Sequence, residues 1–167
     1  MSRFKDLGPT AAGTLAAVLL CGPSAVAAGP PADHGPSGQQ KTFTLLAQVT
    51  RESLLHLGTG DAPSQGDQIV FAEDLLRDGE KVGHGGGACT VTFLARPGAG
   101  EAQCQVTTAL PGGQLTTQGL QSFADHVLGE FDVAITGGTG DFRSAGGFVH
   151  GVPRSATEIE LTFHLDR

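Results

Sequence analysis

Two neighbouring acidic residues, Glu73 and Asp74, are the best candidates for proton transfer in this sequence. Glu73 lies in period-two register with the apolar residues Phe71 and Leu75, and alternate residues of a strand share one face. A carboxyl group buried on an apolar face has a raised pKa, which suits general acid or base catalysis. A shift of one residue would place Asp74 on that face instead, and a solvent-exposed outer face is the alternative for both. The sequence leaves these alternatives open.

Four further residues are candidates for contacts with a substrate. Arg143, the third catalytic candidate, has a planar guanidinium that can hold a carboxylate or an enolate; its alternative role is an ion pair where a strand starts. Gln118 has an amide that can form a hydrogen bond in a pocket, and its alternative role is an ordinary strand position. Phe71 and Phe142 are expected to give a substrate apolar contacts.

The sequence predicts no metal site and no cofactor. His126, His150 and His164 are scattered, without the spacing of a metal-ligand set. The glycine-rich stretch 83–87 has no following helix and no lysine, so it does not match a phosphate-binding loop. We expect this stretch to form a flexible loop that exposes His84 to solvent.

The elements that must position these side chains are strands. From Thr42 onward, apolar and polar residues alternate in eight segments that are separated by glycine and proline. The best helical pattern, at 53–57, is only about one turn long. The alternating segments are 43–49, 69–75, 89–93, 104–110, 115–120, 131–135, 142–150 and 159–165. They predict an all-β fold, an eight-stranded antiparallel barrel whose interior can hold one small ligand.

The N-terminal segment predicts export. Residues 1–27 have the basic start, the short apolar stretch and the small residues of a signal peptide, with cleavage expected after Ala27 or Ala28. Residues 28–41 are rich in Pro, Gly and Ser and are expected to be a disordered leader. The barrel domain is then 42–167. A secreted protein without a membrane segment after cleavage is the expectation.

The charge of the chain argues against a nucleic-acid partner. The formal net charge is −7, with 10 Lys and Arg residues against 17 Asp and Glu residues, and the basic residues form no cluster. A nucleic-acid site needs cations gathered on one face, and an anionic membrane surface needs the same. A small apolar ligand or substrate is the expected partner.

Two cysteines remain after the predicted cleavage, Cys89 and Cys104. An even number of cysteines in an exported chain indicates a disulfide, and two buried thiols are the alternative. Direct pairing of the two would put the hairpin tip at residues 96 and 97, whereas Pro97 and the glycines after it place the tip slightly later. A β-bulge would absorb the difference.

The run from Ala134 to Phe148, AITGGTGDFRSAGGF, resembles the signature G-G-[ST]-G-x-F-x-x-A-x-G that plant dirigent proteins and allene oxide cyclases share. Three earlier segments are also similar to these families. The stretch 68–83 is similar to an acidic dirigent strand and the Val-Gly that follows it. The stretches 87–91 and 115–119 are similar to Gly-x-Cys-Thr and Leu-Ser-Val-Gln-Gly of allene oxide cyclases. The resemblance covers 43–165.

The chain is therefore identified as a bacterial secreted member of the allene oxide cyclase and dirigent-like barrel superfamily. The resemblance implies the same barrel, a homotrimer packed through its outer faces, and, for an enzyme, a cofactor-independent isomerase or cyclase. This chain has no Tyr to match the barrel tyrosine of allene oxide cyclases, and Gly146 stands where dirigent proteins usually carry Arg. We expect an exported small-molecule-binding barrel, either an isomerase or cyclase or a non-catalytic binding or structural protein.

Overall fold

The computed structural model describes residues 40–59, 63–125 and 127–166. Its strands are β1 (Lys41–Leu55), β2 (Gln68–Arg77), β3 (Glu80–Arg96), β4 (Ala99–Leu110), β5 (Gly113–Ala124), β6 (Val127–Leu128), β7 (Phe131–Gly138), β8 (Gly146–Pro153) and β9 (Glu158–Asp166). A 3-10 turn, η1 (Gly140–Phe142), follows β7. No helix in the described ranges is long and apolar enough to cross a membrane. The predicted signal peptide and most of the leader lie outside these ranges.

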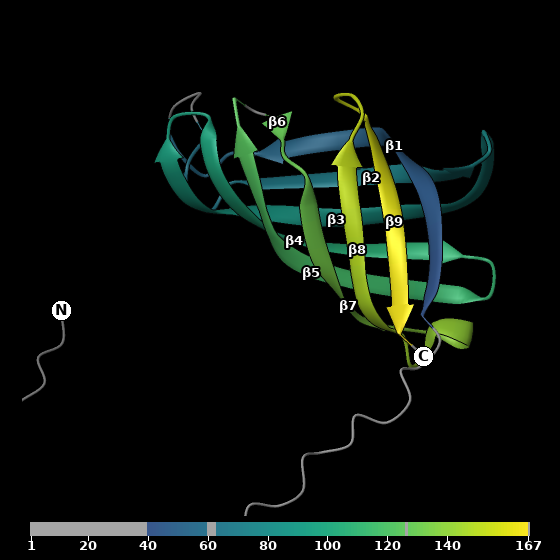
Figure 1. The fold of residues 1–167 in the computed structure, drawn as a ribbon. Coiled ribbons are helices and arrows are strands. Elements are labelled where there is room, and N and C mark those ends of the chain that lie inside the picture. Colours follow the sequence, from purple (N-terminus) through teal and green to yellow (C-terminus); the bar gives the residue numbers. More distant parts are fainter. Residues whose placement is uncertain (1–39, 60–62, 126, 167) are drawn as a thin grey trace, which may run out of the picture. The chain divides into compact units, whose positions relative to one another are not determined.

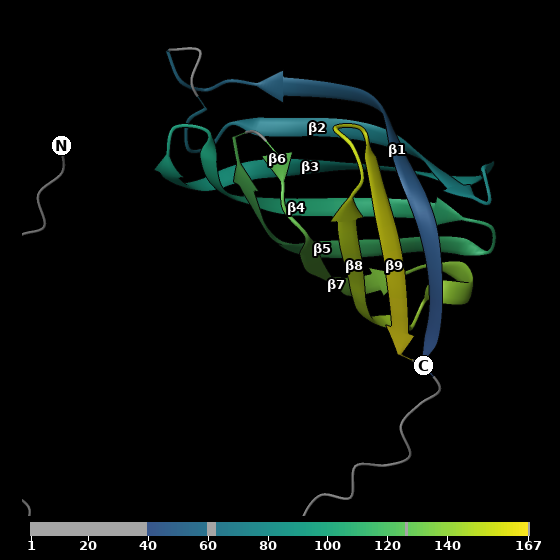
Figure 2. The same ribbon diagram turned by 45° about the horizontal axis from the view of Figure 1, so that its top comes forward.

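Eight of the strands close into an antiparallel barrel, which confirms the predicted fold (Figure 1). Around the ring the order is β4, β3, β2, β1, β9, β8, β7 and β5. The ring is closed because β5 pairs with β4 along its whole length. Strand β6 has two residues and pairs with the end of β5. Figure 2 shows β1 bending from the layer of β2 to the side of β9, so that it belongs to both sides of the barrel.

The alternating pattern of the sequence fills the interior with apolar side chains. On β1, Leu45 and Ala47 are buried, while Thr44 and Gln48, which flank them, are exposed. The largest completely buried apolar side chains are Leu45, Leu75, Leu115 and Phe163. Removing one such side chain from water contributes about 1.5–3 kcal/mol, so this core accounts for much of the stability of the fold.

The glycine-rich stretch 83–87 lies within β3, which corrects the prediction of a loop. His84 pairs with Asp74 on β2 and with Ala109 on β4, and its side chain is exposed on the outer face. Glycine is needed here because neighbouring atoms occupy the space of a side chain. A Cβ atom added at Gly87 would lie 2.9 Å from Cγ2 of Val106. Glycine inside a strand thus marks a close approach rather than a break.

Two other element boundaries differ from the prediction. Strand β1 continues beyond the predicted segment 43–49 to Leu55, which pairs with Gln68, so the weak helical pattern at 53–57 does not give a helix at residues 53–55. Phe142 belongs to η1 and β8 starts only at Gly146. Gly140 has φ of 58°, a left-handed conformation that favours glycine and turns the chain into η1.

The predicted disulfide joins Cys89 on β3 to Cys104 on β4. The two residues are direct cross-strand partners, with Cα atoms 4.0 Å apart. The register of the hairpin shifts between Val91 and Phe93 and again further toward the tip. These irregularities supply the extra residues that the sequence required between the bridge and the turn.

Candidate functional site

The carboxyl group of Glu73 lies inside the barrel. Glu73 is on the inner face of β2, between the inward positions of Phe71 and Leu75, and only 4% of its surface is exposed. Its Oε1 atom has no hydrogen-bond partner among the described residues. Loss of hydration raises the pKa of this carboxyl group from 4.5 to about 7. At neutral pH the group is therefore present in both protonated and ionised forms.

Gly85 makes the room that this carboxyl group occupies. Gly85 is the cross-strand partner of Glu73 on β3. A Cβ atom at position 85 would lie 2.5 Å from Oε1 and 3.0 Å from Cγ of Glu73, so the Glu73 side chain would have to shift. The next residue in this row, Thr108 on β4, is also buried and brings a second polar side chain to the same level of the barrel.

Asp74 points to the outside of the barrel. Its carboxylate forms an ion pair with Lys81, with Nζ and Oδ1 2.7 Å apart, and its side chain is about one third exposed. The structure therefore decides between the two registers that the sequence left open. Glu73 is the interior acid and Asp74 is a surface residue.

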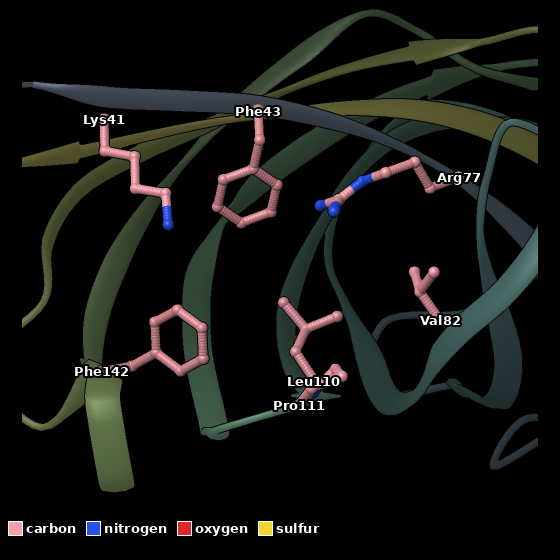
Figure 3. Close-up of a pocket in the computed structure, with 7 residues that line it drawn as sticks. All are labelled: Lys41, Phe43, Arg77, Val82, Leu110, Pro111 and Phe142. Carbon is pink, nitrogen blue, oxygen red and sulfur yellow. The ribbon is translucent and has the colours of Figure 1, made fainter.

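A cavity of about 350 Å³ opens at the end of the barrel where β1 begins. Most of its wall is apolar, with two aromatic rings, Phe43 and Phe142, on opposite sides (Figure 3). Two cationic side chains, Lys41 and Arg77, also line this opening. The complete lining is Lys41, Phe43, Arg77, Val82, Leu110, Pro111 and Phe142. We call this cavity the mouth.

The mouth and the Glu73 carboxyl group lie at different depths of the barrel. Arg77, Leu75 and Glu73 occupy successive inward positions on β2. With a strand rise of about 3.3 Å per residue, Glu73 lies roughly 13 Å further along β2 than Arg77. Leu75, which is completely buried, lies between them, and Glu73 is not part of the wall of the mouth.

The remaining predicted contact residues are not all brought together. Phe71 is half-buried on the inner face next to Glu73, and Phe142 lines the mouth. Gln118 is exposed on the outer face of β5, and Arg143 is exposed directly after η1. Gln118 therefore takes its alternative role of an ordinary strand position, because alternation turns its side chain to the face of the barrel wall opposite to Glu73.

Sequence reasoning missed Lys41, Phe43 and Arg77 as parts of a site. Each is near the end of a strand, where a solvated surface position is the ordinary interpretation. The signal that could have found them is their inward register, since Lys41 and Phe43 share the face of Leu45, and Arg77 shares that of Leu75.

A second buried acid, Asp67, was also not identified as a candidate from the sequence. Asp67 is completely buried just before β2 and accepts hydrogen bonds from the backbone N–H groups of Leu57 and Ser64, each at 2.8 Å, and from the Ser64 hydroxyl group at 2.7 Å. Nδ1 of His56 lies 3.0 Å from Oδ2. The donors, led by the Leu57 N–H, hold the pKa of Asp67 well below its usual range. This acid is ionised and fully bonded, which indicates a structural role.

The histidines and carboxylates do not gather into a metal centre in the part of the chain that the structure describes. There, no three residues of the types His, Cys, Asp and Glu are close enough to share an ion. His150 instead pairs with Asp132 at 2.8 Å, and the ring of His164 stacks on Phe148 on the outer face.

The fold defines a small closed antiparallel barrel with an opening at one end and a carboxyl group inside. Residues 47–163 match the family described as the allene oxide cyclase barrel like domain, and the chain belongs to this family. The resemblance found in the sequence is thereby confirmed as to family and fold. No curated protein matches the chain.

Solved structures place the chain among barrels with diverse activities. A pyocyanin demethylase is 27% identical, with a TM-score of 0.65 over 75% of this chain and 99% of that chain. The exo-specific intermolecular Diels-Alderase AbnU is 16% identical, with a TM-score of 0.57 over 77% of this chain and 98% of that chain. A pterocarpan synthase dirigent protein is 18% identical, with a TM-score of 0.59 over 78% and 95% of the two chains. The last two likenesses show the shared fold alone.

Proposed function

We propose that this protein binds a small, largely apolar molecule in its barrel and that Glu73 transfers a proton to or from it. The observation that carries the proposal is the unpartnered Oε1 atom in an apolar interior. An unpaired buried polar group costs free energy. A polar group of a ligand placed beside Glu73 would remove that cost and supply a partner that the described residues do not.

The chemistry that fits is a cofactor-independent isomerisation or cyclisation. Ionised Glu73 would take a proton from an acidic C–H or O–H group of the ligand, and the protonated carboxyl group would return it at another atom. The proton and the electron pairs then balance within the ligand, without an oxidant or a reductant. A carboxyl group with a pKa of about 7 is suited to both steps at neutral pH.

The comparisons support a catalytic barrel in general terms. One similar structure is described as a demethylase and another as a Diels-Alderase. These activities differ in bond chemistry, so they support catalysis on a barrel of this fold and name no reaction for this chain.

A second candidate function is non-catalytic binding. The observation in its favour is the packing between the mouth and Glu73, where Leu45 and Leu75 are completely buried. In a carrier the ligand would occupy the mouth alone, and Glu73 would remain below a closed apolar layer.

Solvent deuterium exchange separates the two candidates. The protein is incubated in D₂O with a panel of small carbonyl compounds that have acidic C–H groups, and incorporation is followed by mass spectrometry. In the catalytic case, wild-type protein labels at least one compound, Glu73→Gln does not, and both bind that compound. Asp74→Asn, which removes the neighbouring outer carboxylate, is the matched control and keeps the wild-type rate. Equal labelling by wild-type protein and Glu73→Gln would refute the role of Glu73.

Export and assembly are also part of the proposal. We infer secretion, with residues 1–27 removed, and N-terminal sequencing of protein from the culture medium tests it. A homotrimer is supported by apolar residues on the outer face of the barrel, of which Leu120 is more than half exposed. Light scattering of a stable monomer at micromolar concentration would contradict the trimer.

A further inference from the structure

Two cations converge on the apolar mouth. Lys41 is the first residue of β1 and Arg77 is the last residue of β2, and Figure 3 shows both side chains directed toward the cavity on either side of Phe43. The guanidinium carbon of Arg77 lies 5.8 Å from the centre of the Phe43 ring. An aromatic face attracts a cation at this distance, which holds the guanidinium at the opening instead of in free solvent.

Neither cation has a carboxylate partner within the described residues, whereas several other basic side chains do. Lys81 pairs with Asp74, Arg96 with Asp125, and Arg154 with Glu160. In a chain with a net charge of −7, acids to pair with Lys41 and Arg77 are abundant. Lys41 and Arg77 can therefore pair with an anionic ligand in the mouth, because no carboxylate of the described residues pairs with them.

The rest of the wall is apolar and partly aromatic. Phe142 and Leu110 lie across the cavity from Phe43 in Figure 3, and apart from Lys41 and Arg77 none of the lining residues is charged. The volume of about 350 Å³ is at the lower end of the range for small-molecule sites. A ligand that matches this wall has a compact apolar or aromatic body and one acidic group.

We propose that the mouth binds an organic anion, with its carboxylate or an equivalent acidic group between Lys41 and Arg77 and its apolar body between Phe43 and Phe142. This proposal rests on the proposed function, because it names the class of small molecule that the barrel takes. It also orients the ligand. The anion stays at the rim, and the apolar end points toward Leu75 and, roughly 13 Å further along β2 than Arg77, toward Glu73.

Two dyes that differ in one charged group provide the test. 8-Anilinonaphthalene-1-sulfonate and N-phenyl-1-naphthylamine share the same aromatic rings, and only the first has a sulfonate. Fluorescence titrations are made with wild-type protein, Lys41→Gln, Arg77→Gln and Arg154→Gln. The last variant removes one positive charge from the β8–β9 turn, at the opposite end of the barrel, and is the matched control. Circular dichroism and thermal melting verify that each variant is folded.

We expect wild-type protein to bind the sulfonate dye more tightly than the neutral dye. Lys41→Gln and Arg77→Gln should each weaken the sulfonate dye about tenfold, the usual order for loss of a charge-assisted contact. Binding of the neutral dye should change by less than about twofold, and Arg154→Gln should leave both affinities unchanged. Displacement of the dye by 4-phenylbutyrate but not by 4-phenylbutyramide should confirm the preference with a carboxylate.

Three results would overturn the proposal: equal affinity of the two dyes, equal losses in Arg154→Gln and the mouth variants, or no binding of either dye to wild-type protein. These readouts are independent of Glu73. Failure of Glu73→Gln to change deuterium labelling would refute the catalytic role and leave the anion site standing, whereas equal dye affinities would refute the anion site alone.

Discussion

The carboxyl group of Glu73 lies where the side chain of its cross-strand partner, residue 85, would begin. Because residue 85 is glycine, no side chain competes with the carboxyl group for this space beside β3. Glu73 can therefore be buried on β2 because its partner on β3 has no side chain.

Gly85→Ala is expected to destabilise the barrel by about 1–3 kcal/mol, because the new methyl group overlaps the Glu73 carboxyl group. In the double variant Glu73→Ala/Gly85→Ala the two effects should be less than additive, since Glu73→Ala removes the carboxyl group that the new methyl group at position 85 would meet. Urea unfolding measures both. Gly146→Ala, whose Cβ would meet nothing within 4 Å, is the control. A Gly85→Ala variant as stable as this control would contradict the packing.

The stability of the protein is expected to fall as the pH rises from about 4.5 to about 7. The pKa of Glu73 is 4.5 when exposed and about 7 in the barrel, so the folded state holds a proton that the unfolded state has released. Burial of the neutral form is favoured at low pH, and this advantage is lost as the pH passes the folded pKa. The shift of about 2.5 units corresponds to a loss of about 3 kcal/mol.

Urea unfolding of wild-type protein and Glu73→Gln between pH 4.5 and pH 8 measures this effect. The Gln variant has no proton to lose at this position, so the difference between the two curves isolates Glu73. If the two free energies of unfolding stay parallel throughout the range, the pKa of Glu73 is not raised.

Removal of the disulfide is expected to cost about 3 kcal/mol, the loss predicted for opening a loop of about 15 residues. The bridge spans 15 residues between Cys89 and Cys104. The double variant Cys89→Ala/Cys104→Ala should unfold at lower urea than the wild type, and a reductant should affect only the wild type. Thiol titration of denatured, unreduced wild-type protein without the signal segment should find no free thiol; two titratable thiols would show that the bridge does not form.

Asp67→Asn is expected to lower the melting temperature at pH 7, because an amide nitrogen cannot accept the hydrogen bonds that the carboxylate takes from Leu57 and Ser64. The pKa of Asp67 is depressed, so its contribution is present above the usual value of 3.8 and is lost as the pH falls below it. The difference from wild type should therefore shrink in acid. Ser64→Ala removes one side-chain donor and should have a smaller effect; an equal or larger effect would contradict the central role of Asp67.

The interior of the barrel could largely be predicted because alternation is a local property of the sequence. Register with Phe71 and Leu75 is enough to make Glu73 an interior candidate. The choice between Glu73 and Asp74 could not be made, because a shift of one residue exchanges the faces and only pairing with β1 and β3 decides it.

The mouth could not be predicted because it depends on closure of the ring. Lys41 and Arg77 come from the ends of different strands, and the curvature of the barrel brings them to one opening together with Phe142 from η1. The orientation of Gln118, in contrast, follows from the local alternation of β5 and not from closure of the ring. Its motif matched the families, but the same alternation that buries Thr117 turns Gln118 outward.

The pairing of β1 with β9 has a consequence for synthesis of the chain. The hydroxyl groups of Thr44 and Thr162 are 3.1 Å apart although the residues are separated by 118 positions. During translation β1 emerges first and must wait for the last strand before the ring is complete. Pairing between such distant segments slows folding, and until it occurs both β1 and β8 have free edges that other chains can join. A nascent chain stalled before residue 158 is therefore the species most in need of a chaperone.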